Sequence, residues 1–133
     1  MNEHQLDVLF VISSLDRGGS ERQMIILAAG LIGLGHRAKI GTLIKPGSLA
    51  EEARERGIPV IDFSGGAGSV LRGLLGLRRF VDEERPDVIH PYLPRDNALV
   101  ALLKPLLRPS KVIWGVRASD VDLTKYSPTT RLL

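Results

Sequence analysis

Residues 8–20 read Val-Leu-Phe-Val-Ile-Ser-Ser-Leu-Asp-Arg-Gly-Gly-Ser and give the first indication of the fold. The first five are apolar without a break, which is typical of a parallel strand covered on both faces of its sheet. Paired glycines then mark a turn, and Ser20 with Gln23 matches a capping box that opens a helix. Apolar residues recur at helical spacing until Gly35, which favours a left-handed stop. The stretch therefore predicts a strand, a turn and a helix in succession.

The same unit recurs along the rest of the chain. Four more strands are predicted, at residues 38–44, 58–63, 87–90 and 111–116. Three more helices are predicted: one opened by a capping box at Ser48 and Glu51 and ended by Gly57, one at residues 70–84, and one capped by Asp96. This alternation predicts an α/β fold, a Rossmann-like open parallel sheet with helices on both faces.

The connections predict how the strands are ordered. Right-handed crossovers give the order 3-2-1-4-5, in which the direction of winding reverses between strands one and four. Ligands of open α/β sheets bind in the crevice that this reversal opens at the carboxyl ends of the strands. We therefore look for the functional site after residues 8–12 and 87–90.

The amino-acid composition excludes several classes of protein and several kinds of functional site. The 133 residues fit one domain, and 44% hydrophobic with 25% charged residues is ordinary for a globular protein. Cysteine is absent, which excludes disulfide scaffolds and thiol chemistry. The net charge of +3 is far short of a nucleic-acid footprint, and no spacing of His, Asp or Glu suggests a metal site. We expect no cofactor, metal or nucleic-acid partner.

The sequence carries neither a secretory signal nor an apolar stretch long enough to span a membrane, and we expect the protein in the cytoplasm.

The turn after the first strand is a candidate ligand site. Gly18 and Gly19 let the backbone approach a ligand closely, and the helix predicted from Ser20 directs its unpaired N–H groups toward the crevice. This arrangement suits a phosphate or a sugar hydroxyl. It lacks the three spaced glycines of a dinucleotide fingerprint and the Gly-Lys-Ser/Thr of a P-loop. An ordinary tight turn explains two glycines equally well.

Several motifs in a fixed order resemble one family. They are Gly-Gly-Ser-Glu-Arg at 18–22, Ile-Leu-Ala at 26–28, Leu-Gly-His at 34–36, Gly-Ser-Leu at 47–49 and Arg-Pro-Asp-Val-Ile-His at 85–90. Together they resemble the N-terminal half of the family-four (group 1) glycosyltransferases over residues 7–117.

The resemblance implies one half of a two-domain enzyme of the GT-B architecture. Such an enzyme moves a sugar from a nucleotide-sugar donor to a glycan or lipid-linked acceptor with retention of configuration, here in surface polysaccharide or glycolipid biosynthesis. Its N-terminal half mainly binds the acceptor. Residues 1–133 would then be a single acceptor-side domain that stops before the C-terminal donor-binding domain and is inactive by itself.

The resemblance also implies roles for residues near the crevice. Gly18 and Gly19 correspond to the glycine loop beside the donor diphosphate and the acceptor, and Glu21 with Arg22 opens the helix behind it. His90 corresponds to a histidine that ends strand four and faces the cleft. These residues also have non-functional explanations. Charged residues in the first turn of a helix, such as Glu21 and Arg22, more often contact only solvent or each other. A histidine at the end of a strand, such as His90, can be there only to form a hydrogen bond with the backbone.

Two further candidates lie later in the chain. Asn97 corresponds to an asparagine at the start of the next helix, and with the glycine loop, Glu21 and Arg22 it forms the expected substrate-binding set. Arg117 lies where many members have a cleft histidine, so that role is open; an arginine there could neutralise phosphate, or form an ordinary surface salt bridge. His90 and Arg117 are the expected catalytic residues.

Two other functions share this fold. A non-catalytic nucleotide-binding or regulatory α/β module needs no transfer chemistry, and a sugar-nucleotide epimerase has the same two-half architecture.

The predicted helix at 70–84 raises the question of a membrane contact. It is apolar over a wide arc bordered by Arg72, Arg78 and Arg79, as in basic helices that lie on the anionic inner face of a membrane. A helix that covers a sheet looks similar, because arginine stems pack over its apolar border.

Overall fold

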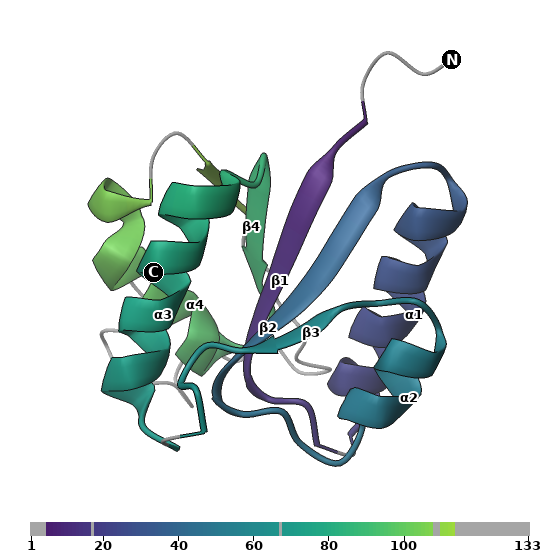
Figure 1. Cartoon of the computed structure of the whole chain (residues 1–133), viewed down its shortest axis with the longest axis horizontal. Helices are drawn as coiled ribbons and strands as arrows, with labels where there is room; N and C mark the ends of the chain where they lie inside the picture. Colours follow the sequence, from purple (N-terminus) through teal and green to yellow (C-terminus); the bar gives the residue numbers. More distant parts are fainter. Residues whose placement is uncertain (1–4, 17, 67, 108–109, 114–133) are drawn as a thin grey trace, which may run out of the picture.

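The computed structural model describes residues 5–16, 18–66, 68–107 and 110–113 (Figure 1). In chain order its elements are β1 (Asp7–Ser14), α1 (Gly19–Gly33), β2 (Arg37–Lys45), α2 (Ala50–Glu55), β3 (Val60–Asp62), α3 (Val70–Glu84), β4 (Val88–Pro91), α4 (Pro94–Leu103), the 3-10 helix η1 (Lys104–Leu106) and β5 (Lys111–Val112). Every strand pair is parallel, and the order β3-β2-β1-β4-β5 confirms the predicted α/β topology.

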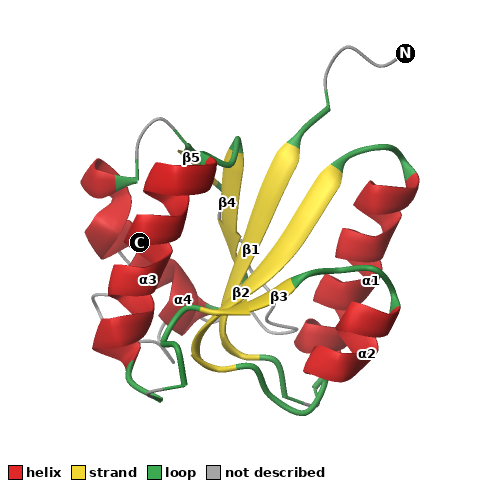
Figure 2. Cartoon of the chain, in the orientation of Figure 1, coloured by secondary structure: helices red, strands yellow, loops and turns green. Residues whose placement is uncertain are grey.

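The sheet separates two layers of helices, with α1 and α2 on one face and α3 and α4 on the other (Figure 2). Phe10 and Ile12 of β1 pack in the cluster that includes α1 and α2, whereas Leu9 and Val11 pack in the cluster that includes α3 and α4. Successive strand residues point to opposite faces, so a strand buried on both must be apolar throughout. This explains the unbroken run in β1.

Glycines let α3 approach the sheet closely. A methyl group at Gly73 would overlap the carbonyl oxygen of Leu43 in β2, and one at Gly76 would overlap that of Phe63 just after β3. Backbone atoms cannot swing aside as side-chain ends can, so only glycine fits at these points. The helix therefore lies directly against the β2–β3 edge of the sheet.

Both predicted capping boxes are wrong. The helix α1 begins at Gly19 with Gly18 as its N-cap and no side-chain cap, so Ser20 lies inside the first turn. The helix α2 begins at Ala50, and the backbone N–H of Ser48 is bound by Asp16 Oδ1 at 3.1 Å. Each helix start is fixed by tertiary contacts of its loop, which outweigh the local capping preference.

The other boundaries agree closely with expectation. The helix α3 spans residues 70–84 as predicted, and Ser69 caps it by accepting a bond from the N–H of Arg72. The positive φ angles of Gly35 (95°) and Gly57 (83°) confirm the expected stops after α1 and α2. The helix α4 starts at Pro94 and not at Asp96, because proline is well suited to the first helical position.

The predicted strands differ from the observed ones only at their ends. The strand β3 is shorter than predicted and β4 is shifted by one residue. The described part of the predicted last strand begins at Lys111, while residues 114–116 lie outside the described ranges. None of the helices in those ranges is long and apolar enough to cross a membrane.

Candidate functional site

The ends of β1 and β4 lie next to each other where the strand order reverses. Val11 of β1 pairs with Pro91 of β4, and the N–H of Tyr92 donates to the carbonyl oxygen of Val11 at 3.2 Å. Ser13 lies near the end of β1, which is followed by the turn to α1, and β4 is followed by α4. We call this region the β1/β4 site and define it as Ser13, Gly18, Glu21, His90 and Asp96.

Asp96 is the residue of this site that sequence reasoning missed as a functional group. Its side chain is completely buried, and Ser13 Oγ donates a 2.6 Å hydrogen bond to Asp96 Oδ1. The β1–β2 register shifts between Ile12 and Ser14, and the backbone N–H of Ser13 also donates to Asp96. The carboxylate thus joins the irregular end of β1 to the first turn of α4. No local pattern reveals this pair, because the partners are 83 residues apart.

Burial raises the pKa of Asp96 from its ordinary 3.8 to about 6. The hydrogen bonds from Ser13 and the charge of Arg95 lower this pKa, and the nearby charge of Glu21 raises it further. Among the described residues, Asp96 Oδ2 is buried without a hydrogen-bond partner. A carboxyl group that titrates near neutral pH at the carboxyl edge of a sheet is a typical feature of a functional site.

The glycine turn lies beside this carboxyl group. Glu21 folds back over Gly18, so that a methyl group at Gly18 would overlap Glu21 Oε1. The space around Gly19 is open, with no atom within 4 Å of the position that a methyl group would take. The backbone of Gly18 is extended and strain-free, so its small size serves the approach of Glu21, while Gly19 is the position open to a ligand.

Asp16 holds the same turn from the other side. Its carboxylate accepts hydrogen bonds from Ser14 Oγ at 2.6 Å and from the N–H of Ser48, with Lys45 Nζ 3.9 Å away. The bond from Ser14 is the main reason that the pKa of Asp16 is lowered, followed by the bond from Ser48. These contacts fasten the β1–α1 turn to the loop after β2.

His90 lies partly buried between two aromatic rings. Its ring centroid is 5.3 Å from that of Phe10 and 5.4 Å from that of Tyr92, and both of these neighbours are fully buried. Because Phe10 packs in the cluster with α1 and α2, His90 lies on that face of the sheet, next to the carboxyl edge. The histidine therefore packs against β1 and the residue that follows β4, next to the carboxyl ends of these strands.

The remaining sequence candidates fall in different places. Asn97 is buried beside Asp96 in the first turn of α4. Arg22 forms an ion pair with Glu52 of α2 at 3.2 Å, on an exposed part of the surface. Arg117 lies outside the described residues. Within the described ranges no group of three or more His, Asp and Glu could hold a metal ion.

Comparisons with known proteins identify a family from the sequence and a fold from the structure. The sequence profile of Glycosyltransferase Family 4 matches residues 17–132. The structure is similar to a glycosyltransferase from Rickettsia africae ESF-5, with a TM-score of 0.60 and 17% identity over 92% of this chain and 34% of that one. It is also similar to the glycosyltransferase SnogD from Streptomyces nogalater, with a TM-score of 0.53 and 17% identity over 84% of this chain and 44% of that one.

The two structural matches establish the fold, and they also show how much of each relative this chain covers. At 17% identity the two structures demonstrate a shared Rossmann-like fold, of the kind found in GT-B glycosyltransferases. The chain spans about a third of the Rickettsia protein and less than half of SnogD. No curated protein sequence matches it.

Proposed function

Because the chain belongs to Glycosyltransferase Family 4, we propose that it is the acceptor-side half of a two-domain glycosyltransferase. The whole enzyme transfers a sugar from a nucleotide-sugar donor to a glycan or lipid-linked acceptor, with retention of configuration. The donor is held mainly by a C-terminal domain that follows these residues, so the chain alone has little or no transferase activity. Its product serves surface polysaccharide or glycolipid biosynthesis.

The meeting of the β1–α1 turn with the start of α4 carries this proposal. The helix α1 is fifteen residues long and its N-cap, Gly18, provides no side chain for its first N–H groups. Free N–H groups and the positive end of a helix dipole favour an anionic oxygen, such as one of the donor diphosphate. The open space at Gly19 gives that oxygen access to the backbone.

The neighbouring carboxylates suit the acceptor. The Glu21 carboxylate lies over Gly18 and close enough to Asp96 to raise the pKa of Asp96. Carboxylates accept hydrogen bonds from sugar hydroxyls, and a fixed charge beside the reacting oxygen supports transfer without a protein nucleophile. From the family resemblance we assign His90 and Arg117 as catalytic residues, with Arg117 supplying a positive charge to phosphate, and Asn97 to substrate binding. Arg22, paired with Glu52, contacts substrate only after that exposed pair opens.

A matched pair of glycine variants tests this use of the turn. Gly19→Ala places a methyl group in the space assigned to the ligand, whereas Gly30→Ala makes the same change near the other end of α1, where the space is equally open. Calorimetric titration with a nucleotide sugar and with a polyprenyl phosphate should give weaker binding for Gly19→Ala, by about tenfold, and unchanged binding for Gly30→Ala.

The same titrations separate the competing functions. Equal binding by both variants would contradict the proposed site. Binding of nucleotides with no binding of any acceptor would favour a non-catalytic nucleotide module or an epimerase half.

The exposed face of α3 favours a second contact, with a membrane. Leu71 and Leu75 are 68% and 59% exposed, and the neighbouring Arg72, Arg78 and Arg79 are exposed as well. Apolar side chains together with basic residues suit an anionic surface, to which each basic residue adds about 1 kcal/mol. We infer that the domain works in the cytoplasm at the inner face of the membrane, and sedimentation with anionic vesicles tests this.

A further inference from the structure

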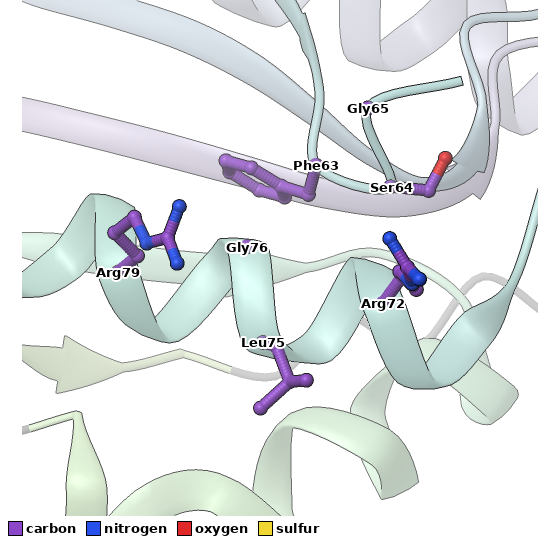
Figure 3. Close-up of a pocket in the computed structure, with 7 residues that line it drawn as sticks. All are labelled: Phe63, Ser64, Gly65, Arg72, Leu75, Gly76 and Arg79. Atoms are coloured by element: carbon purple, nitrogen blue, oxygen red, sulfur yellow. The ribbon is translucent and has the colours of Figure 1, made fainter. Parts of the chain in front are cut away.

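We propose that the pocket between α3 and the segment after β3 binds a phosphate-bearing ligand through Arg72 and Arg79. This α3 pocket has a volume of about 480 Å³ (Figure 3) and is lined by Phe63, Ser64, Gly65, Arg72, Leu75, Gly76 and Arg79. It is separate from the β1/β4 site, because β2 lies between β3 and β1. The inference therefore does not depend on the sugar-transfer proposal.

The two arginines are placed to act on one ligand. They are seven residues apart, which is about two helical turns, so both lie on the same side of α3. In Figure 3 their side chains extend toward the Phe63–Ser64 segment on either side of Gly76, while Leu75 points away. Gly76 brings α3 against the carbonyl of Phe63, so that the Phe63–Ser64 segment lies over the helix between the two arginines (Figure 3).

The positive charge of the pocket is not neutralised by the protein. Within the described ranges neither Arg72 nor Arg79 forms an ion pair, and no acidic residue lines the pocket. Asp82 and Glu83 follow Arg79 by one turn without pairing with it. Guanidinium groups bind phosphate oxygens through parallel N–H bonds, so two unpaired arginines favour a dianion over a single carboxylate.

The acid at the end of β3, Asp62, already has hydrogen-bond partners in the adjoining loop. Asp62 accepts hydrogen bonds from the N–H of Ser64 at 3.0 Å, from Ser64 Oγ at 2.7 Å and from the N–H of Gly66 at 2.9 Å. The N–H of Gly65 is bonded to the carbonyl of Asp62, and that of Gly68 to Ser64 Oγ. Because these loop donors are already used, a phosphate in this pocket must be held by the arginines.

The pocket has room for more than a phosphate group. Phe63 provides apolar surface beside the two charges, which suits a ligand with an organic body attached to its phosphate. That ligand is either a soluble phosphate ester or the phosphate of a lipid headgroup, and the exposed Leu71 lies on the same helix. The chemistry at the arginines is the same in both cases.

Variants of three arginines on α3 test the proposal. Arg72→Gln and Arg79→Gln each remove a charge from the pocket, and Arg78→Gln removes one from the same helix without touching the pocket lining. We expect saturable amide shifts at Gly65 and Gly76 when the 133-residue chain is titrated with inorganic phosphate or glycerol 3-phosphate. Each pocket variant should weaken this binding by about tenfold, and Arg78→Gln should not.

Vesicles distinguish the two sources of phosphate. If phosphatidic acid vesicles bind the wild type and Arg56→Gln, which removes an exposed charge at the end of α2 on the opposite face of the sheet (Figure 2), but not the pocket variants, and the soluble esters bind weakly, the ligand is a lipid headgroup. If the soluble esters saturate the pocket at lower concentration than the vesicles, the ligand is a soluble ester. An absence of saturable shifts with every probe, or an equal loss for all three variants, would overturn the proposal.

Discussion

At the scale of single residues, Asp96 is a buried carboxyl group whose pKa is raised by its burial. It is fully buried, and its carboxylate is held by Ser13 on the neighbouring strand end. The sequence predicted a helix cap there, because aspartate next to a helix start is normally a cap. The sequence did not predict that α4 starts two residues earlier, at Pro94. Asp96 therefore lies inside the first turn, and its carboxylate binds Ser13, which is 83 residues away in the sequence.

The raised pKa of Asp96 predicts an unusual dependence of stability on pH. In the folded chain the Asp96 carboxyl group stays protonated up to about pH 6, whereas in the unfolded chain it loses its proton at about pH 3.8. Because the folded chain binds this proton more tightly, Asp96 makes its full contribution to the free energy of unfolding below pH 3.8. That contribution, roughly 3 kcal/mol, is lost as the pH rises through 6. Urea unfolding between pH 4 and 7 should reveal the decline, and Asp96→Asn should remove it.

A second variant makes this test specific. Ser13→Ala removes a hydrogen bond that lowers the pKa of Asp96, so the decline in stability should extend to higher pH. An Asp96→Asn chain that keeps the wild-type slope would show that another group is responsible.

At the scale of elements, the strands and helices could be predicted from the sequence, because the burial of their faces determines where apolar residues stand along the chain. The apolar run of β1 and the helical spacing in residues 70–84 follow directly from which faces are covered. The predicted caps of α1 and α2 were wrong, because the loops before these helices are held by distant partners: the N–H of Leu15 donates to the carbonyl of Pro46, and the N–H of Ser48 donates to Asp16 Oδ1. The α3 pocket could not be predicted either, because it depends on how closely Gly76 approaches Phe63.

The exposed leucines of α3 give a prediction at this scale. The double variant Leu71→Ser and Leu75→Ser should reduce sedimentation with anionic vesicles at low salt, because it removes the apolar part of the proposed contact. Leu102→Ser, at a leucine of α4 that is 76% exposed, is the matched control and should sediment like the wild type. If the wild type does not pellet with anionic vesicles at low salt, the membrane contact is refuted.

At the scale of the whole molecule, the order of the strands determines where a ligand can bind. Reversal of winding between β1 and β4 brings the glycine turn, His90 and the start of α4 to one edge, although they are far apart in the chain. This juxtaposition was predicted from the alternation of strands and helices alone. The sequence did not predict the identity of the donor and the acceptor, because the glycine turn, His90 and the start of α4 carry no pattern that is specific to one sugar or one nucleotide.

The most direct test of the proposed function is a map of where substrates perturb the chain. We predict that a nucleotide sugar and a polyprenyl phosphate, added to the ¹⁵N-labelled protein, shift the amide signals of Gly18, Gly19 and His90 more than those of any other region outside the α3 pocket. Shifts confined to the amino ends of the strands, near Arg37 and Asp87, would contradict the assignment of this edge to sugar transfer.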